Sequence, residues 1–260
     1  MDYETILVRR ADAALVITMN RPERRNAINS KMMDELVAAL RGGEGDDEVR
    51  AVIITGGSEF FSAGADLKEA GERRTAVDAM RMLKSWRRVT NTLEELARPV
   101  IAAIEGFCLT GGLELALACD IRIAGEGASF AITSSKLGTV PGFGATQRLP
   151  RIVGVSRALE MLFSAEPIDT EEAYRIGILN RNTARGNALN EAKSLADIYS
   201  QRAPLSLSLL KRAVYRGIQM DLASGLDFEN SLGATLSSTS DRQEGIAAFL
   251  QKRKPQFRGR

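Results

Sequence analysis

Short apolar runs alternate with amphipathic segments along most of the chain. Short runs rich in apolar residues predict strands at residues 4–9, 14–19, 49–55, 100–105, 120–125 and 128–133, and the runs at 49–55 and 100–105 are apolar enough to predict buried strands. Apolar residues that recur on one face predict helices, at residues 30–40, 75–97, 155–165 and 169–177. Ser30 is the predicted N-cap of the first helix.

The order of these elements predicts an α/β fold. Repeats of strand, loop, helix and strand favour a core with parallel strands. From about residue 187 onward, the chain reads as successive helical segments without a strand pattern. We therefore expect a core of residues 1–199 and a mainly helical subdomain of residues 200–260.

Composition narrows the class of protein. The 260 residues are 44% hydrophobic, which is enough for a substantial core. A net charge of +2 argues against a dedicated nucleic-acid binder. We expect a soluble cytoplasmic protein that does not bind membranes, because the chain has neither a signal sequence nor an apolar run long enough to cross a bilayer. Cys108 and Cys119 lie in apolar stretches and are predicted to be buried, reduced thiols.

Histidine is absent from the sequence. Its absence excludes histidine-based triads, histidine metal ligands and histidine acid–base catalysis. The chain also lacks paired-cysteine spacings, a clustered acidic calcium loop and glycine-rich nucleotide-binding motifs, so we expect no metal site. Any chemistry must use carboxylates, lysine, hydroxyls, cysteine or the backbone.

A single glutamate interrupts the apolar stretch TGGLELALACD, residues 110–120. The neighbours of Glu114 are apolar, which predicts a buried carboxylate, and burial of an unpaired charge is costly. Gly111 and Gly112 stand at the predicted start of a helix, where N–H groups lack partners and the helix dipole is positive. Glycine also lets a ligand approach those groups closely. The segment therefore combines backbone donors with a carboxylate one turn further on.

A second glycine-containing loop, GGSEFFSAGAD, follows the predicted strand at residues 49–55. Ala65 lies after Gly64 at a strand-to-helix turn, where its N–H is expected to lack a partner. If this loop meets Gly111, the two N–H groups form a pocket for a developing oxyanion. One such donor is worth about 3 kcal/mol in a transition state. Glu114 would then move a proton beside the polarised carbonyl.

Four segments, in this order, resemble the crotonase (enoyl-CoA hydratase/isomerase) superfamily. They read NRPERRNAIN, FFSAGADLKE, ARPVIAAIEGFCLTGGLELALACDIRIA and KLGTVPGFGATQRLPRIVG, and the ending FLQKRKPQFRGR is also similar. The resemblance covers essentially the whole chain. It implies a spiral of ββα units followed by a C-terminal helical trimerisation region, in a homotrimer or a hexamer made of two trimers. It also implies an enzyme that stabilises the enolate of an acyl-CoA thioester.

The resemblance also implies roles for particular residues. Ala65 and Gly111 would supply the oxyanion-hole N–H groups. Glu114 matches the first of two glutamates that act on water in the hydratases. The implied substrate-binding positions are Arg24, Arg25, Ala63, Ala65, Asp66, Leu67, Lys68, Gly111 and Gly112. No cofactor is expected, because CoA enters as part of the thioester substrate.

The chain departs from the family pattern at Ser134. With the frame fixed on Phe130 and Gly138, Ser134 takes the place of the second hydratase glutamate. Three interpretations follow. Glu114 works alone as a hydratase base, with Ser134 holding the water; or the protein is an enoyl-CoA isomerase or runs another specialised crotonase reaction; or it is a non-catalytic acyl-CoA binder. Of these, we predict an enoyl-CoA hydratase.

Two further features allow more than one interpretation. The basic C-terminal segment KRKPQFRGR is either a solvated tail or a cover for CoA phosphates, with a contribution from a neighbouring subunit. Met80, Met82, Leu83 and Trp86 are either part of the acyl-pocket wall or ordinary core residues.

Overall fold

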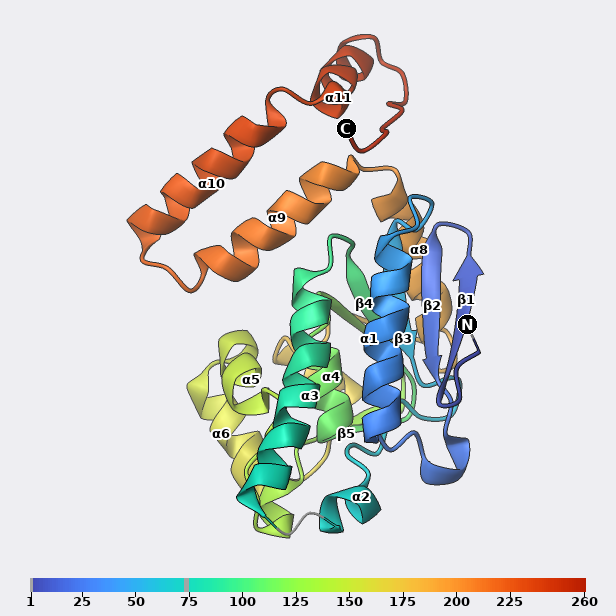
Figure 1. The fold of residues 1–260 in the computed structure, drawn as a ribbon, viewed down its shortest axis with the longest axis vertical. Coiled ribbons are helices and arrows are strands. Elements are labelled where there is room, and N and C mark those ends of the chain that lie inside the picture. Colours follow the sequence, from blue (N-terminus) through green and yellow to red (C-terminus); the bar gives the residue numbers. More distant parts are fainter. Residues whose placement is uncertain (1, 73–74) are drawn as a thin grey trace.

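The computed structural model describes residues 2–72 and 75–260, and its central feature is a six-stranded sheet. The strands are ordered β1-β2-β3-β4-β6-β9, and Figure 1 shows the first four of them side by side. Their bounds are β1 (Ile6–Ala11), β2 (Ala14–Met19), β3 (Ala51–Thr55), β4 (Val100–Ile104), β6 (Ile121–Gly125) and β9 (Arg181–Thr183). The hairpin of β1 and β2 is antiparallel, and the following neighbours pair in parallel. The predicted α/β class with parallel strands is confirmed.

Both faces of the central strands β3 and β4 are buried, because their side chains alternate between two layers of helices. Val52 and Ile54 belong to the cluster that contains residues of α1 (Ser30–Glu44), α3 (Ala76–Glu95) and α4 (Gly111–Leu117). Ala51 and Ile53 belong to a second cluster with α8 (Ala188–Ser200). This two-sided burial explains why β3 and β4 read as apolar runs in the sequence.

The predicted N-cap of α1 is wrong by one residue. Asn29, not Ser30, has the extended cap conformation, and its side chain accepts a hydrogen bond from the Met32 N–H. Ser30 is the first helical residue, and its N–H instead donates to the Glu69 carboxylate. The helix also continues to Glu44, beyond the predicted end at Leu40.

A small second sheet leads into the candidate site. It consists of β5 (Phe107–Leu109), β7 (Ser129–Ala131) and β8 (Ile168–Asp169), in that order. β5 directly precedes α4. The remaining elements of this region are η1 (Pro22–Arg24), α2 (Leu67–Gly71), η2 (Ser134–Leu137), α5 (Ala145–Val153), α6 (Val155–Ser164) and α7 (Thr170–Arg175).

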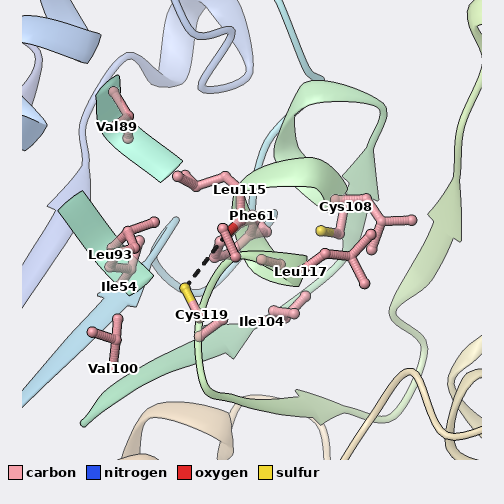
Figure 2. Packing of buried hydrophobic residues seen from close by; sticks show 14 of the residues in the cluster. Ile54, Phe61, Val89, Leu93, Val100, Ile104, Cys108, Leu115, Leu117 and Cys119 are labelled. Carbon is pink, nitrogen blue, oxygen red and sulfur yellow. Dashed lines mark hydrogen bonds between the residues drawn. The ribbon is translucent and has the colours of Figure 1, made fainter. Parts of the chain in front are cut away.

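The core surrounds α4. Figure 2 shows Leu115 and Leu117 of this helix packed among buried side chains that include Phe61 and Cys108. The Cys119 thiol donates to the Leu115 carbonyl oxygen over 3.5 Å. Both cysteines are free and buried, as predicted, and burial raises the pKa of Cys119 to about 12. Neither thiol is therefore primed for nucleophilic chemistry.

The C-terminal helices confirm the predicted helical region. α9 (Pro204–Gly217) and α10 (Leu222–Leu236) lie side by side and extend away from the sheet, and α11 (Ser240–Leu250) follows (Figure 1). Lys211 of α9 forms an ion pair with Asp120 over 2.8 Å and donates to the Leu93 carbonyl. This contact holds α9 against the core.

The division of the chain at residue 200 stays a prediction. Within residues 2–72 and 75–260, no helix is long and apolar enough to span a membrane.

Candidate active site

The two predicted oxyanion donors lie next to one another. A Cβ atom added to Gly111 would stand 3.1 Å from the Ala65 nitrogen. Ala65 follows β3 through a loop, and Gly111 is the first residue of α4. Within the described part of the chain, neither N–H group has a hydrogen-bond acceptor. Two unpartnered amides from distant segments therefore meet at one place.

Backbone hydrogen bonds hold the two loops together. The N–H groups of Phe61 and Ser62 both donate to the Phe107 carbonyl, over 3.1 and 3.2 Å, and the Leu109 N–H donates to the Ser62 carbonyl over 2.9 Å. The loop after β3 therefore runs alongside β5, and both segments reach the site together. The stacked rings of Phe60 and Phe107, with centroids 5.0 Å apart, add an apolar contact.

Glycine permits this close approach at two positions. Gly64 has φ +102°, a conformation that residues with a side chain rarely adopt, and a Cβ there would lie 2.9 Å from the Leu109 carbonyl oxygen. A Cβ on Gly112 would lie 2.7 Å from the Ser62 Cβ. Side chains at either position would push α4 and the loop apart.

Glu114 is completely buried in α4, with 0% exposure. Its Oε1 accepts hydrogen bonds from the Phe143 N–H over 2.9 Å and the Ala145 N–H over 3.0 Å. Its Oε2 has no partner among the described residues. Burial, the largest influence, raises the pKa of Glu114 to about 7, although the two amides and the Arg148 guanidinium oppose the rise.

The unpartnered oxygen distinguishes Glu114 from the other buried acids of the described chain. Glu35 receives hydrogen bonds at both oxygens from Glu4 and Thr5. Glu105 receives them from the N–H groups of Gly186 and Ala188. Asp241 receives them from the N–H groups of Arg258 and Gly259. These three carboxylates serve the fold, whereas Glu114 keeps one oxygen available.

Arg122 fixes the far end of the helix that carries Glu114. Its buried guanidinium donates to the Cys119 carbonyl over 2.8 Å, to the Ala116 carbonyl over 3.4 Å, and to the Ile178 carbonyl over 2.6 Å. Ala116 lies in the last turn of α4 and Cys119 in the turn just after the helix, so the guanidinium holds the C-terminal end of α4 in place. Nothing in the sequence pattern predicted this role for Arg122.

Ser134 is buried at the start of η2. Its carbonyl accepts from the N–H and hydroxyl of Thr139, while its own hydroxyl has no protein partner within the described ranges. The preceding Thr133 is hydrogen-bonded to Thr110, the residue before Gly111. The segment at residues 133–134 therefore lies beside the amide pair, although no hydrogen bond between described residues joins Ser134 to Glu114.

An aromatic pair closes one side of the amides. Trp86 and Phe143 stack with ring centroids 3.7 Å apart, and an atom of each ring would lie 3.2 Å from a Cβ added to Gly111. The sequence left open whether Trp86 lines the acyl pocket or belongs to the core, and the structure places it next to Gly111. Phe143 was missed, and its only sequence signal is the glycine on either side. Met80, in contrast, is exposed. Residues 73–74, near the start of this segment, lie outside the described residues.

The predicted CoA-binding residues lie on the loop of Arg24 and Arg25, on the oxyanion loop and on α2. Ala63 donates its N–H to the Arg25 carbonyl over 3.0 Å, which ties the loop of Arg24 and Arg25 to the oxyanion loop. Both arginine side chains are exposed. Leu67 and Lys68 are exposed on α2.

Asp66 has a structural partner that the sequence did not reveal. Its carboxylate caps α2 by accepting from the N–H groups of Lys68 and Glu69, and it pairs with Arg21 over 3.0 Å. Arg21 was not among the predicted residues.

The basic C-terminal segment folds back on α11, where Arg253 pairs with Glu244. A cavity of about 440 Å³ lies between this segment and α11.

Known proteins resemble this chain over its whole length. The model of the enoyl-CoA hydratase/isomerase family matches residues 9–260, so the chain belongs to that family, within the crotonase superfamily. A short-chain-enoyl-CoA hydratase from Clostridium acetobutylicum is 39% identical over 255 residues, which are 98% of this chain and 97% of the relative. A 2,3-dehydroadipyl-CoA hydratase from Escherichia coli is 40% identical over 258 residues, 98% of this chain and 99% of the relative.

Solved structures agree with the family. An enoyl-CoA hydratase from Bacillus anthracis superposes with a TM-score of 0.94 at 36% identity, covering 99% of this chain and 100% of that chain. The predicted crotonase-like fold is therefore confirmed, including its C-terminal helices.

Proposed function

We propose that the protein is an enoyl-CoA hydratase that adds water to a 2-enoyl-CoA thioester, with Glu114 as its single carboxylate. The observation that carries the proposal is the Oε2 of a fully buried Glu114, which has no partner among the described residues, in the same helix whose first residue, Gly111, lies next to the Ala65 nitrogen. The family and the names of the relatives support the same reaction class.

The proposed mechanism uses the backbone pair to hold the thioester oxygen. Glu114, as carboxylate, takes a proton from water, and the hydroxide oxygen bonds to the β-carbon. The electron pair of the carbon–carbon double bond forms a double bond between the α-carbon and the thioester carbon, the carbonyl pair moves to the thioester oxygen, and the N–H groups of Ala65 and Gly111 stabilise the resulting enolate. The protonated Glu114 then gives its proton to the α-carbon, which yields a 3-hydroxyacyl-CoA and restores the carboxylate.

The remaining residues bind substrate in this proposal. Ser134 holds the attacking water through its unpartnered hydroxyl. The CoA and acyl path follows Arg24, Arg25, Ala63, Asp66, Leu67, Lys68 and Gly112. CoA arrives as part of the substrate, and the reaction as written needs no separate cofactor because water supplies both added groups.

A hydration assay with crotonyl-CoA tests the proposal. Wild-type protein should consume the conjugated enoyl thioester, and Glu114→Gln should lose at least about 100-fold in kcat, because glutamine keeps the acceptor for the Phe143 N–H but cannot take a proton. Turnover that survives in Glu114→Gln would contradict the assignment. Tight thioester binding without turnover on any enoyl chain length would instead indicate an acyl-CoA binder.

A second candidate reaction is double-bond isomerisation. The lone carboxylate with one available oxygen favours it, because a single group can remove a proton at one carbon and return it two carbons away. The test is incubation of a 3-enoyl-CoA in deuterated water. Formation of the conjugated 2-enoyl-CoA, with no hydration of that product, would favour isomerisation over hydration.

A further inference from the structure

Thr110, the residue before the Gly111 amide, has an unusual backbone conformation. Its φ is +43° and its ψ is −108°. Threonine is β-branched, and a β-branched residue with positive φ is a genuine outlier. Such a conformation persists only where the surrounding structure imposes it, and it is then a reason to look for a functional constraint.

Hydrogen bonds from one neighbouring segment impose this conformation. The Thr110 N–H donates to the Ala131 carbonyl over 2.7 Å. The Thr133 N–H donates to the Thr110 hydroxyl oxygen over 3.1 Å, and the two threonine hydroxyls lie 2.7 Å apart. Thr110 is thus held through both its main chain and its side chain by the end of β7 and the residues that follow it.

The orientation of the Gly111 N–H depends on Thr110. This N–H belongs to the peptide group between the two residues, so rotation about ψ of Thr110 turns it. Thr110 also lies against the loop of the other donor, because a Cβ added to Gly64 would stand 3.3 Å from the Thr110 Cβ and 3.2 Å from the Gly111 nitrogen. A change at Thr110 would therefore change the angle between the two amides.

We propose that Thr110 and Thr133 form a threonine clamp that aims the Gly111 N–H at the thioester oxygen. Both are positioning residues for the proposed hydration, on which this inference rests. Their hydroxyl–hydroxyl bond keeps Thr110 in its strained conformation, and the amide pair is thereby set before substrate binds. Preset donors stabilise a developing oxyanion more than donors that must reorient during the reaction.

The clamp is tested with two matched pairs of variants. Thr133→Val removes a hydroxyl while it retains shape and the Thr133 N–H, and Thr133→Ser keeps the hydroxyl. Thr110→Ala and Thr110→Ser form the same comparison at the other end of the bond. Each variant is assayed for hydration of crotonyl-CoA. Each is also titrated with butyryl-CoA labelled isotopically at its thioester carbonyl, a saturated ligand whose infrared carbonyl band moves to lower frequency when the N–H groups polarise it.

We expect Thr133→Val to lower kcat by about tenfold with less than about a twofold change in KM, and to reverse about half of the wild-type carbonyl shift. Thr133→Ser should retain the wild-type values in both measurements. Thermal unfolding shows which variants are folded. If Thr133→Val does not fold, Thr110→Ala decides the question in the same measurements.

Two results would overturn the threonine clamp, and a third would overturn the proposed function. A folded Thr133→Val with wild-type kcat and carbonyl shift would overturn the clamp alone, since the wild type would still hydrate and polarise its ligand. Equal losses in Thr133→Val and Thr133→Ser would also overturn it, because the hydroxyl would then not be the cause. A wild-type protein with neither hydration nor a carbonyl shift would overturn the proposed function itself.

Discussion

Burial raises the pKa of Glu114 to about 7, and within the described residues one of its oxygens has no donor. A general base must be ionised, so kcat/KM for hydration should rise with pH and level off above an apparent pKa of about 7. We expect one rising limb, because Ser134 cannot supply the second titrating acid of a two-carboxylate site. Rate measurements between about pH 5 and about pH 9 test this. A bell-shaped profile would show that a second titrating group takes part.

The same pKa affects stability. The folded-state value lies above the ordinary 4.5, so folding favours the protonated carboxyl. The associated stability is fully present below pH 4.5 and is lost as the pH rises through about 7. Glu114→Gln is neutral throughout and should lack this loss. The difference in unfolding free energy between the variant and the wild type should therefore change in favour of the variant by on the order of 3 kcal/mol from about pH 4 to about pH 9. Urea unfolding at both pH values measures the difference, and parallel pH curves would contradict it.

Ser134 offers a direct test of the single-carboxylate site. Its side chain is buried, its hydroxyl has no partner among the described residues, and the preceding Thr133 is hydrogen-bonded to Thr110, the residue before Gly111. Ser134→Glu restores a carboxylic acid there and should raise kcat for hydration by at least about tenfold. Ser134→Ala, the control, should lower kcat because the attacking water loses a partner. Without a gain in the glutamate variant, either the placement of residue 134 or the single-base mechanism is wrong.

Gly112 sets the distance between α4 and the loop after β3. A methyl group there would lie 2.7 Å from the Ser62 Cβ and 2.9 Å from the Ser62 carbonyl oxygen. Gly112→Ala should cost about 1–3 kcal/mol in unfolding free energy and lower hydration, because the two amides would separate. Gly42→Ala in α1 is the matched control, since no atom of another described segment lies within 4 Å of its added methyl group. It should leave hydration unchanged and stabilise α1 by up to about 1 kcal/mol. Equal effects of the two variants would refute the packing explanation.

Periodicity predicted the long elements well and the short ones poorly. The runs that became β3, β4 and β6 are buried on both faces, so their apolar character is unambiguous. β5 escaped prediction because three residues cannot show a period. α5 escaped because Pro150 lies inside it, and proline normally ends a helix.

The site was predictable only where one short segment carries its own signal. Glu114 stood out as a lone acid among apolar residues, and Gly111 and Gly112 marked the start of its helix. The meeting of Gly111 with Ala65 depends on backbone bonds between β5 and a distant loop, which no local pattern encodes. Arg21 and Arg122 act through carbonyls and a carboxylate brought near by folding, so they looked like ordinary surface arginines in the sequence.

At the scale of the whole molecule, α9 presents apolar side chains to solvent. Leu210 and Val214 are each 60% exposed, and Ile218 continues the series at the same spacing. An apolar surface of this kind marks an interaction site in most soluble proteins.

We predict that these side chains are buried in a homotrimer, or in a hexamer of two trimers. Sedimentation velocity should show that assembly for the wild type. The double variant Leu210→Glu with Val214→Glu should sediment as a monomer, because charges would be buried without partners. Leu7→Glu on β1 is the control and should leave the assembly intact. A wild-type monomer would contradict the prediction.

The buried guanidinium of Arg122 ties the end of α4 to two segments at once, the turn after the helix and the chain before β9. If the end of α4 unfolded, the positively charged guanidinium of Arg122 would be left buried without hydrogen-bond acceptors. Partial openings of the molecule should therefore begin in the peripheral helices and leave α4 closed, so its hydrogen-bonded amide protons should exchange with solvent only in the rarest, most extensive openings. A molecule whose α9 and α10 have loosened would still carry an assembled reaction centre.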